Sequence, residues 1–367
     1  MAGQWREKWI GWRNRLLADP AFQRTAARLW FTRPVARRRA RALFDLVAGF
    51  TYSQTLAAAL ESGLLARLAE RPLTTADAAA AIDVPEEGTD RLLRAARALG
   101  LVERLGERWA LGADGAALLG NPGIAEMVAH HALLYADLAD PLSQLRARGG
   151  GRLSGYWRYA EHAGDGDGDQ VAPYSRLMAA SQALIADHVT HAYRFAQHQR
   201  MMDVGGGEGR FIRAVASVAP RLHFTLFDLP AVGARAADAL GAAGLGDRVA
   251  ITGGNFLTES LPQGHDLVTL IRVLHDHDDD PARQLLRNIH AALPPGGRLL
   301  IAEPMAETPG SEPAGDAYFG LYLWAMGSGR PRSSAEIGAM LAEAGFRRSR
   351  RVRTSIPLTV SVMLAER

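Results

Sequence analysis

Residues 201–218 read MMDVGGGEGRFIRAVASV and decide the fold. Apolar residues at 201–204 predict a short buried strand, and the run at 211–218 predicts a helix. Between them, Gly205 and Gly207 let the backbone turn sharply and let a ligand approach without meeting a Cβ atom. A strand, a glycine-rich turn and a helix in this order are typical of a nucleotide-binding α/β sheet.

The same alternation of strands and helices continues outward from this stretch. Further short apolar strands are predicted at 223–227, 249–251, 267–271 and 298–302. One helix is expected to begin with Asp280 as its cap and Pro281 at its first position. This βαβ pattern predicts an α/β fold, a Rossmann-like, doubly wound parallel sheet with helices on both faces. Weak alternation at 349–365 predicts a terminal antiparallel hairpin.

The glycine-rich turn distinguishes between two kinds of nucleotide cofactor. Its G-x-G-x-G spacing departs from the G-x-G-x-x-G of dinucleotide-binding turns. Asp203 and Glu208 place negative charge there, which would repel a pyrophosphate but suits a cationic ligand. S-adenosylmethionine carries a sulfonium and an ammonium group and no phosphate. We therefore predict S-adenosylmethionine, with a NAD-type dinucleotide and a turn without a ligand as the alternatives.

Two further groups are placed to hold a nucleoside. Asp228 ends the second strand, 23 positions after Gly205, where a carboxylate can accept both ribose hydroxyls. Asn255 and Phe256 follow the third strand, which lies beside the second in a doubly wound sheet. At that position an amide can bond the adenine edge, and a phenyl ring can stack on its face.

A polar stretch after the fourth strand holds the best candidate for proton transfer. Residues 272–280 read RVLHDHDDD, and the carboxyl ends of such strands border the ligand crevice. His275 is a candidate general base, because imidazole titrates near neutral pH. Asp276 is placed to orient the ring, and Glu303 at the end of the fifth strand faces the same crevice.

Two other interpretations of this stretch stay open at this point. His275 and His277 with the aspartates are possible metal ligands, but consecutive side chains converge poorly on one ion. The aspartates also suit a helix N-terminus, where the helix dipole favours negative charge. A loop histidine bonded to the main chain is the second alternative. We predict no metal site.

The first part of the chain, residues 1–40, is a basic arm. Residues 1–42 hold eleven Lys or Arg residues against Glu7 and Asp19, together with four of the seven tryptophans. Such a segment is typical of contact with an anionic membrane surface or with nucleic acid. The alternative is a solvated helical arm that packs on a partner subunit.

The second part, residues 41–160, is predicted to be helical, and the third part, residues 161–367, holds the sheet. Within 41–115, two short helices precede a small β-hairpin, an arrangement like a winged helix. The helix at 90–99 offers three arginines interrupted by leucine and alanine, which suits packing better than base reading. We therefore predict no nucleic-acid partner, and a DNA-binding regulator is the alternative from a different class.

The composition of all 367 residues sets outer limits. Apolar residues make up 48% and charged residues 22%, which is ordinary for a folded water-soluble protein. Without cysteine there are no disulfides, thiolate zinc sites or cysteine nucleophile. The sequence shows neither an apolar run of about 18 residues nor a signal-peptide stretch. We therefore expect a cytoplasmic protein, with peripheral contact at the inner or photosynthetic membrane as a further option.

An ordered set of landmarks resembles the S-adenosylmethionine-dependent O-methyltransferases of the caffeate and acetylserotonin type. The landmarks are Asp203–Gly209, Phe227–Pro230, Gly254–Phe256, Leu274–Asp276, Leu293–Gly297 and Glu303. The unit at 41–115 resembles the dimerisation domain of that family, which implies a homodimer. Residues 33–54 are most similar to the bacterial carotenoid 1-hydroxy O-methyltransferases, which act on hydroxyneurosporene and demethylspheroidene.

The resemblance implies a role for each matching residue. His275 is the base, and Asp276 and Glu303 accompany it. The donor site is lined by Met178, Ser181, Gly205, Gly207, Asp228, Leu229, Asn255, Phe256 and Arg272.

Three positions depart from the family pattern. Asn255 replaces the usual aspartate, and His277 replaces a tryptophan after His-Asp. No glutamate stands near Pro331, where the plant enzymes carry a second carboxylate beside the base. The adenine contact and the full plant acid–base arrangement therefore stay open.

The reaction that the resemblance implies is methyl transfer to the 1-hydroxyl of an acyclic carotenoid, an apolar hydroxylated small molecule. Aromatic and apolar residues at 318–326 then form either a wall for the polyene or ordinary core. The alternatives within the family are a ring C-methyltransferase of bacteriochlorophyll synthesis and an O-methyltransferase of phenolic or polyketide acceptors.

Overall fold

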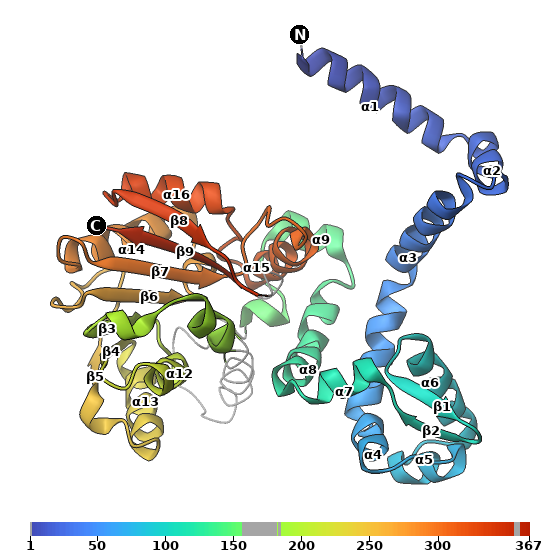
Figure 1. The fold of residues 1–367 in the computed structure, drawn as a ribbon, viewed down its shortest axis with the longest axis horizontal. Coiled ribbons are helices and arrows are strands. Elements are labelled where there is room, and N and C mark those ends of the chain that lie inside the picture. The colour runs from blue at the N-terminus through green and yellow to red at the C-terminus, as the bar shows by residue number, and fades with distance from the viewer. Residues whose placement is uncertain (1, 156–181, 183–184, 356–359) are drawn as a thin grey trace. The chain divides into compact units, whose positions relative to one another are not determined.

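The computed structural model describes residues 2–155, 182, 185–355 and 360–367 (Figure 1). Contacts within the chain divide it into two units, Met1–Leu119 and Gly120–Arg367. Two predicted donor-site residues, Met178 and Ser181, lie outside the described residues.

The first unit is helical apart from one hairpin. Its helices are α1 (Ala2–Ala18), α2 (Pro20–Arg28), α3 (Arg33–Glu61), α4 (Leu64–Glu70), α5 (Thr75–Ile82), α6 (Glu86–Ala98) and α7 (Ala113–Leu119). Strands β1 (Val102–Leu105) and β2 (Arg108–Leu111) pair antiparallel. Trp109 of β2 is buried, and its indole donates to Thr75 Oγ1 at 3.1 Å. The predicted winged-helix-like order, with helices before a hairpin, is confirmed.

The basic arm is helical, but no break separates it from the rest of the unit at residue 40. α3 runs from Arg33 to Glu61 and crosses the predicted boundary. Pro34 suits its first turn, and neither glycine nor proline follows before Gly49. In the part of the chain that the structure describes, no helix is both long and apolar enough to cross a bilayer.

A seven-stranded sheet forms the centre of the second unit, with the strand order β5-β4-β3-β6-β7-β9-β8 (Figure 1). The strands are β3 (Arg200–Val204), β4 (His223–Asp228), β5 (Val249–Gly253), β6 (Leu267–Ile271), β7 (Arg298–Glu303), β8 (Arg348–Val352) and β9 (Ser361–Glu366). Strands β3 to β7 are parallel, and β9 runs antiparallel between β7 and β8. The predicted doubly wound α/β sheet and its terminal hairpin are confirmed.

Helices cover both faces of this sheet. They are α12 (Arg210–Val218), α13 (Pro230–Ala242), α14 (Asp279–Ala292) and α16 (Ser334–Glu343), and the short turns are η1 (Phe195–Gln197) and η2 (Gly246–Arg248). Met201 packs in one apolar cluster with α12 and α13, whereas Met202 packs in another with α14 and α16. The two methionines separate because successive strand residues point to opposite faces.

Two helices that the sequence analysis assigned to the second part group instead with the sheet. They are α8 (Pro122–Asp137) and α9 (Pro141–Ala147), so the division falls at residue 120, not at 160. Leu134 of α8 and Leu153 are buried against Tyr322 and Leu323 of α15 (Gly320–Met326). This apolar cluster ties residues 120–155 to the sheet-bearing unit.

The helix after the polar stretch begins earlier than predicted. Asp278 is its N-cap and Asp279 its first residue, so Pro281 is the third helical residue and Asp280 is not the cap. Proline is tolerated there because the first N–H groups of a helix have no partner within the helix.

Candidate functional site

The glycine turn after β3 adopts backbone angles that favour glycine. Gly205, Gly207 and Gly209 have φ values of 70°, 56° and 74°. A Cβ atom on Gly205 would lie 2.7 Å from Val273 Cγ2, whereas one on Gly207 would meet nothing within 4 Å. Gly205 is therefore required by packing, and Gly207 leaves open space beside the turn that a ligand can enter.

Asp228 links the end of β4 to this turn. Its carboxylate accepts the N–H of Gly207 at 2.8 Å and the N–H of Leu229 at 2.7 Å. Burial raises the pKa of Asp228 above its ordinary value. Each carboxylate oxygen has a second lone pair, so a bound ribose can still donate its hydroxyls here. This turn and this carboxylate fit the adenosine half of S-adenosylmethionine.

The loop after β5 brings the two predicted adenine residues close to the polar stretch. Asn255 is exposed, and its Oδ1 accepts the N–H of Leu257 at 2.9 Å. The half-buried ring of Phe256 packs edge-on against the His277 ring, with 5.4 Å between centroids. The oxygen of Asn255 thus closes its own turn, so an adenine contact through its side chain would use the amide nitrogen.

Arg272 directly follows β6 and has a conformation that is unusual for a residue with a side chain. Its φ is 57°, and its N–H donates to the Ala302 carbonyl at 2.8 Å. Burial lowers the pKa values of His130 and His275, and the positive charge of Arg272 lowers them further. Burial raises the pKa of Tyr318 to about 12, and the charge of Arg272 opposes that rise.

His275 lies in the short turn η3 (Leu274–Asp276) directly after β6 and is 2% exposed. Its Nε2 is 3.4 Å from Asp276 Oδ1, and its Nδ1 makes no hydrogen bond with a described residue. Burial, with help from the charges of Arg272 and Arg332, holds the pKa of the imidazole well below its ordinary value. The ring is therefore neutral near pH 7, which is the form that can accept a proton.

Glu303 contacts the main chain of His275 and not its ring. Its Oε2 accepts the His275 N–H at 3.0 Å, and its side chain is fully buried at the end of β7. Burial raises the pKa of Glu303 to about 7. The structure thus brings the three predicted catalytic residues together, with Glu303 holding the turn that carries the imidazole.

An aromatic wall lies beside His275, formed by α8 and by the helical stretch η4 (Pro313–Phe319) and α15. The Phe319 ring lies 5.8 Å from the His275 ring between centroids. His131 Nε2 is 2.7 Å from the Tyr318 hydroxyl, and His130 Nε2 is 2.9 Å from the Tyr322 hydroxyl. Sequence reasoning missed both histidines, because nothing in residues 122–137 points to the tyrosines nearly 190 positions later.

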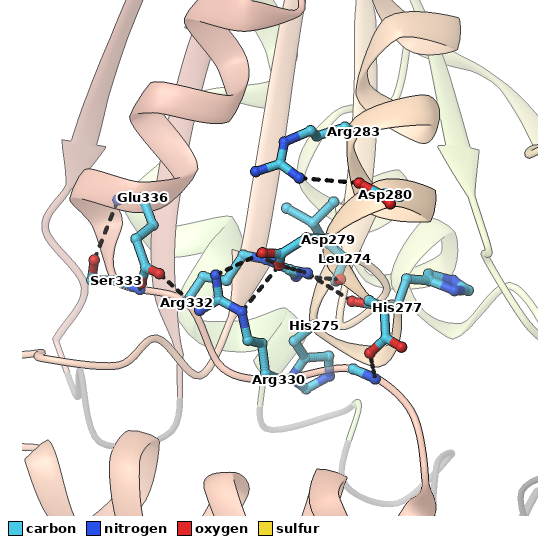
Figure 2. A network of polar contacts seen from close by, with 12 residues as sticks. Leu274, His275, His277, Asp279, Asp280, Arg283, Arg330, Arg332, Ser333 and Glu336 are labelled. Atoms are coloured by element: carbon cyan, nitrogen blue, oxygen red, sulfur yellow. Dashed lines mark hydrogen bonds and ion pairs between the residues drawn. The ribbon is translucent and has the colours of Figure 1, made fainter.

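The sequence analysis considered Pro331 but missed that the segment 328–332 lies directly on the turn that carries His275 (Figure 2). The Arg330 N–H donates to the His275 carbonyl at 2.9 Å, and Arg332 is fully buried beside it. At this place the chain carries Arg-Pro-Arg and no glutamate. Among the described residues, no three His, Asp or Glu side chains are grouped closely enough to hold a metal ion.

Two protein-family profiles match this chain, and together they cover most of its two units. A profile described as the O-methyltransferase domain matches residues 135–347, and one described as the O-methyltransferase dimerisation domain matches residues 44–120. The chain belongs to the O-methyltransferase family. This O-methyltransferase uses S-adenosylmethionine, so the predicted reaction class, cofactor and fold are confirmed.

Two similar relatives are the demethylspheroidene O-methyltransferases of Cereibacter sphaeroides and Rhodobacter capsulatus. They are 39% and 42% identical over 334 residues, covering 90% and 91% of this chain and 88% and 84% of theirs. Two similar structures are the S-adenosylmethionine-dependent methyltransferase SibL and the SAH-bound methyltransferase CalO1 of calicheamicin biosynthesis. Each has a TM-score of 0.77 at 26% identity, covering 89% and 90% of this O-methyltransferase and 98% of each neighbour.

Proposed function

We propose that this O-methyltransferase methylates the 1-hydroxyl of an acyclic carotenoid, with His275 as the general base. The observation that carries this proposal is about 40% identity, over nine-tenths of the chain, to two demethylspheroidene O-methyltransferases. Such an acceptor needs a base for its hydroxyl proton and an apolar surface for its polyene chain. The buried, neutral imidazole of His275 and the aromatic wall beside it suit these two needs.

The cofactor, when bound, supplies an electrophilic methyl group on a sulfonium. Transfer of that methyl would form a carbon–oxygen bond to the acceptor and leave the carbon–sulfur electron pair on sulfur. Gly207 and Asp228 position the donor, which brings the reacting atoms into alignment. His275 takes the hydroxyl proton as the carbon–oxygen bond forms. Because Nε2 faces the Asp276 carboxylate, Nδ1 is the nitrogen left to accept this proton.

The aromatic wall has two parts with different roles. Tyr322, Leu323 and Met326 are buried in an apolar cluster with Leu134 of α8, which is ordinary core packing. Tyr318 and Phe319 are only partly buried; the Phe319 ring contacts the His275 ring, and the Tyr318 ring packs edge-on against Phe319. We assign these two rings to the polyene surface, since a conjugated chain stacks well on aromatic faces.

The basic arm fits a substrate that resides in a bilayer. Trp5, Trp9 and Trp12 recur at helical spacing on α1, and their exposures are 79%, 49% and 56%. Exposed indoles beside arginines are typical of helices that lie on an anionic lipid surface. We therefore assign the arm to peripheral contact with the inner or photosynthetic membrane and the dimerisation domain to a homodimer.

Mass spectrometry of the purified protein tests this function directly. The protein is incubated with S-adenosylmethionine and demethylspheroidene in detergent micelles. A product heavier by one CH₂, with S-adenosylhomocysteine released, is the expected result. If no product forms while calorimetry shows donor binding, the carotenoid assignment is wrong. A tetrapyrrole and a phenol are then the next acceptors to test.

A further inference from the structure

The main chain around His275 has four consecutive carbonyl groups, those of residues 274–277. Each of them accepts a hydrogen bond from the segment 328–332. We call residues 274–277 the His275 turn and residues 328–332 the clamp segment. The bonds are Arg332 Nη1 to Leu274 O at 2.9 Å, Arg330 N to His275 O at 2.9 Å, Ser328 Oγ to Asp276 O at 2.9 Å, and Arg332 Nη2 to His277 O at 2.8 Å. The clamp segment therefore holds every carbonyl of the His275 turn.

Arg332 makes two of these four bonds with one buried guanidinium. The side chain is fully buried, and its Nε and Nη2 also donate to Asp279 Oδ1 at 3.1 and 2.8 Å (Figure 2). Hydrogen bonds from Arg330 and Arg332 lower the pKa of Asp279 to about 2, so this carboxylate stays charged. A buried arginine is costly without such a partner, and Asp279 at the start of α14 supplies it.

The opposite side of the His275 turn is held as well. Glu303 accepts the His275 N–H at 3.0 Å, so main-chain bonds fix the turn from β7 and from the clamp segment. A planar guanidinium has five donors in a fixed fork. Arginine can therefore bind two carbonyls and a carboxylate at once, whereas a lysine ammonium cannot reproduce this geometry.

We propose that Arg332 is the positioning residue for His275: by fixing the carbonyls on either side of it, the guanidinium sets the imidazole against the acceptor hydroxyl. This inference rests on the proposed role of His275 as the base. Misplacement of a catalytic group by 1 Å can cost about 100-fold in rate. We therefore expect loss of the bonds from the clamp segment to lower turnover and to leave donor binding unchanged.

The charge of Arg332 has a second, separable consequence. Charged and titratable groups face His275 from every side: Arg272 at the end of β6, Asp276 and His277 in the turn, Glu303 on β7, and Arg330 and Arg332 in the clamp segment. Arg332 is one of the cations that lower the pKa of the imidazole. Loss of this cation should raise that pKa and move the acid limb of the kcat profile to higher pH.

Three variants distinguish the effect of the forked geometry of the Arg332 guanidinium from the effect of its positive charge. Arg332→Lys keeps the charge but loses the fork, Arg332→Gln loses both, and Ser328→Ala removes one carbonyl bond. Arg283→Gln is the matched control, since Arg283 also pairs with a carboxylate of α14, Asp280, and makes no bond to the His275 turn (Figure 2). The readouts are kcat and KM with demethylspheroidene in micelles, donor affinity by calorimetry, and thermal unfolding.

We expect Arg332→Lys to lower kcat by about 10- to 100-fold with donor affinity and the acid limb unchanged. Arg332→Gln should lower kcat at least as far and also move the acid limb to higher pH. Ser328→Ala should lower kcat by about fivefold, as expected for one hydrogen bond. Arg283→Gln should match the wild-type enzyme in kcat.

A kcat near the wild-type value in both Arg332→Lys and Ser328→Ala would overturn the proposal. His275→Ala, measured alongside, separates this from a failure of the proposed function. If His275→Ala stays active, the base assignment is wrong and the clamp proposal falls with it. Should the Arg332 variants not fold, kcat of Ser328→Ala decides alone. NMR titration of the His275 ring in the S-adenosylhomocysteine complex checks the charge effect without any acceptor.

Discussion

At the residue scale, the protonation state of His275 determines what it can do. The ring is buried and its pKa is held well below the ordinary value, so it is neutral at physiological pH. The hydroxyl of the proposed acceptor is a weak acid, and its oxygen becomes a good nucleophile only as the proton leaves. A positioned base contributes about 10²- to 10⁴-fold to such a step.

We predict that His275→Ala lowers kcat by at least about 100-fold while S-adenosylmethionine affinity stays within twofold. The proposed donor contacts, Gly207 in the turn after β3 and Asp228 at the end of β4, are not altered by this change. Steady-state kinetics and calorimetry on the same preparation measure the two quantities. His290→Ala on α14 is the matched histidine control and should keep full activity. Normal turnover in His275→Ala would exclude a base role.

The carboxyl of Glu303 predicts a pH dependence of stability. Burial raises its pKa to about 7, so the folded protein keeps a proton that the unfolded chain releases near pH 4.5. The stability due to this group is greatest below pH 4.5 and falls as the pH rises to about 7. Glu303→Gln removes that loss and keeps an oxygen for the His275 N–H.

We therefore expect the stability of Glu303→Gln relative to wild type to increase between about pH 5 and pH 8. The gain is at most about 3 kcal/mol, at about 1.4 kcal/mol per pKa unit. Chemical unfolding of both proteins across this range measures it. A constant difference between the two proteins would show that Glu303 titrates normally in the folded state.

At the element scale, two glycines of the turn after β3 have different roles: Gly205 is required by packing, and Gly207 leaves space for a ligand. Gly205→Ala combines a left-handed φ with a 2.7 Å approach to Val273, so we expect a loss of about 2 kcal/mol in stability. Gly207→Ala carries the same kind of backbone strain in open space and should cost about 1 kcal/mol. Its main effect should be on donor affinity, by at least tenfold. Unfolding curves and calorimetry of the two variants distinguish these effects.

The basic arm makes an element-scale prediction of its own. Deletion of residues 1–30 removes α1 and α2, including four tryptophans, and leaves in place α3, which begins at Arg33. We expect binding to anionic liposomes to fall at least tenfold, with donor affinity unchanged. Neutral liposomes are the control, since they lack the charge that attracts the arginines. Equal partitioning of both proteins would assign the arm to another partner.

At the scale of the whole molecule, α3 exposes an apolar stripe within the dimerisation domain. Leu43, Leu46, Val47 and Phe50 follow the i, i+3, i+4, i+7 pattern of one helix face, and each is more than 60% exposed. Large exposed apolar patches mark interfaces, and the family profile for dimerisation begins at residue 44. A second copy of the chain is the occupant that this domain predicts.

We expect Val47→Asp to shift the protein from dimer to monomer in light scattering, because a charge would be buried without a partner at the interface. Val47 is 74% exposed in the single chain, so the substitution should leave the fold of each unit intact. Ala48→Asp, on the same helix but outside the stripe, is the control. A dimer of unchanged affinity in Val47→Asp would place the interface elsewhere.

Local patterns were sufficient for much of this molecule. The strand–turn–helix at 200–218, the alternation of strands and helices along the chain and the position of His275 after β6 are each encoded by neighbouring residues. Two predicted positions differ from the structure: the helix expected to be capped by Asp280 begins at Asp279, and the boundary expected at residue 160 falls after Leu119. The boundary depends on contacts between residues far apart along the chain, such as Tyr322 against Leu134.

The sequence by itself determined the α/β sheet, the glycine turn, the cofactor class and the candidate base, because periodicity and motif spacing act over a few residues. Only the tertiary structure decided how the base is held. Arg332 meets carbonyls more than 50 positions away, Glu303 binds a main-chain N–H, and His131 pairs with Tyr318 across 187 positions. Such contacts form when packing excludes water and each buried polar group must find a partner, a condition that no local pattern records.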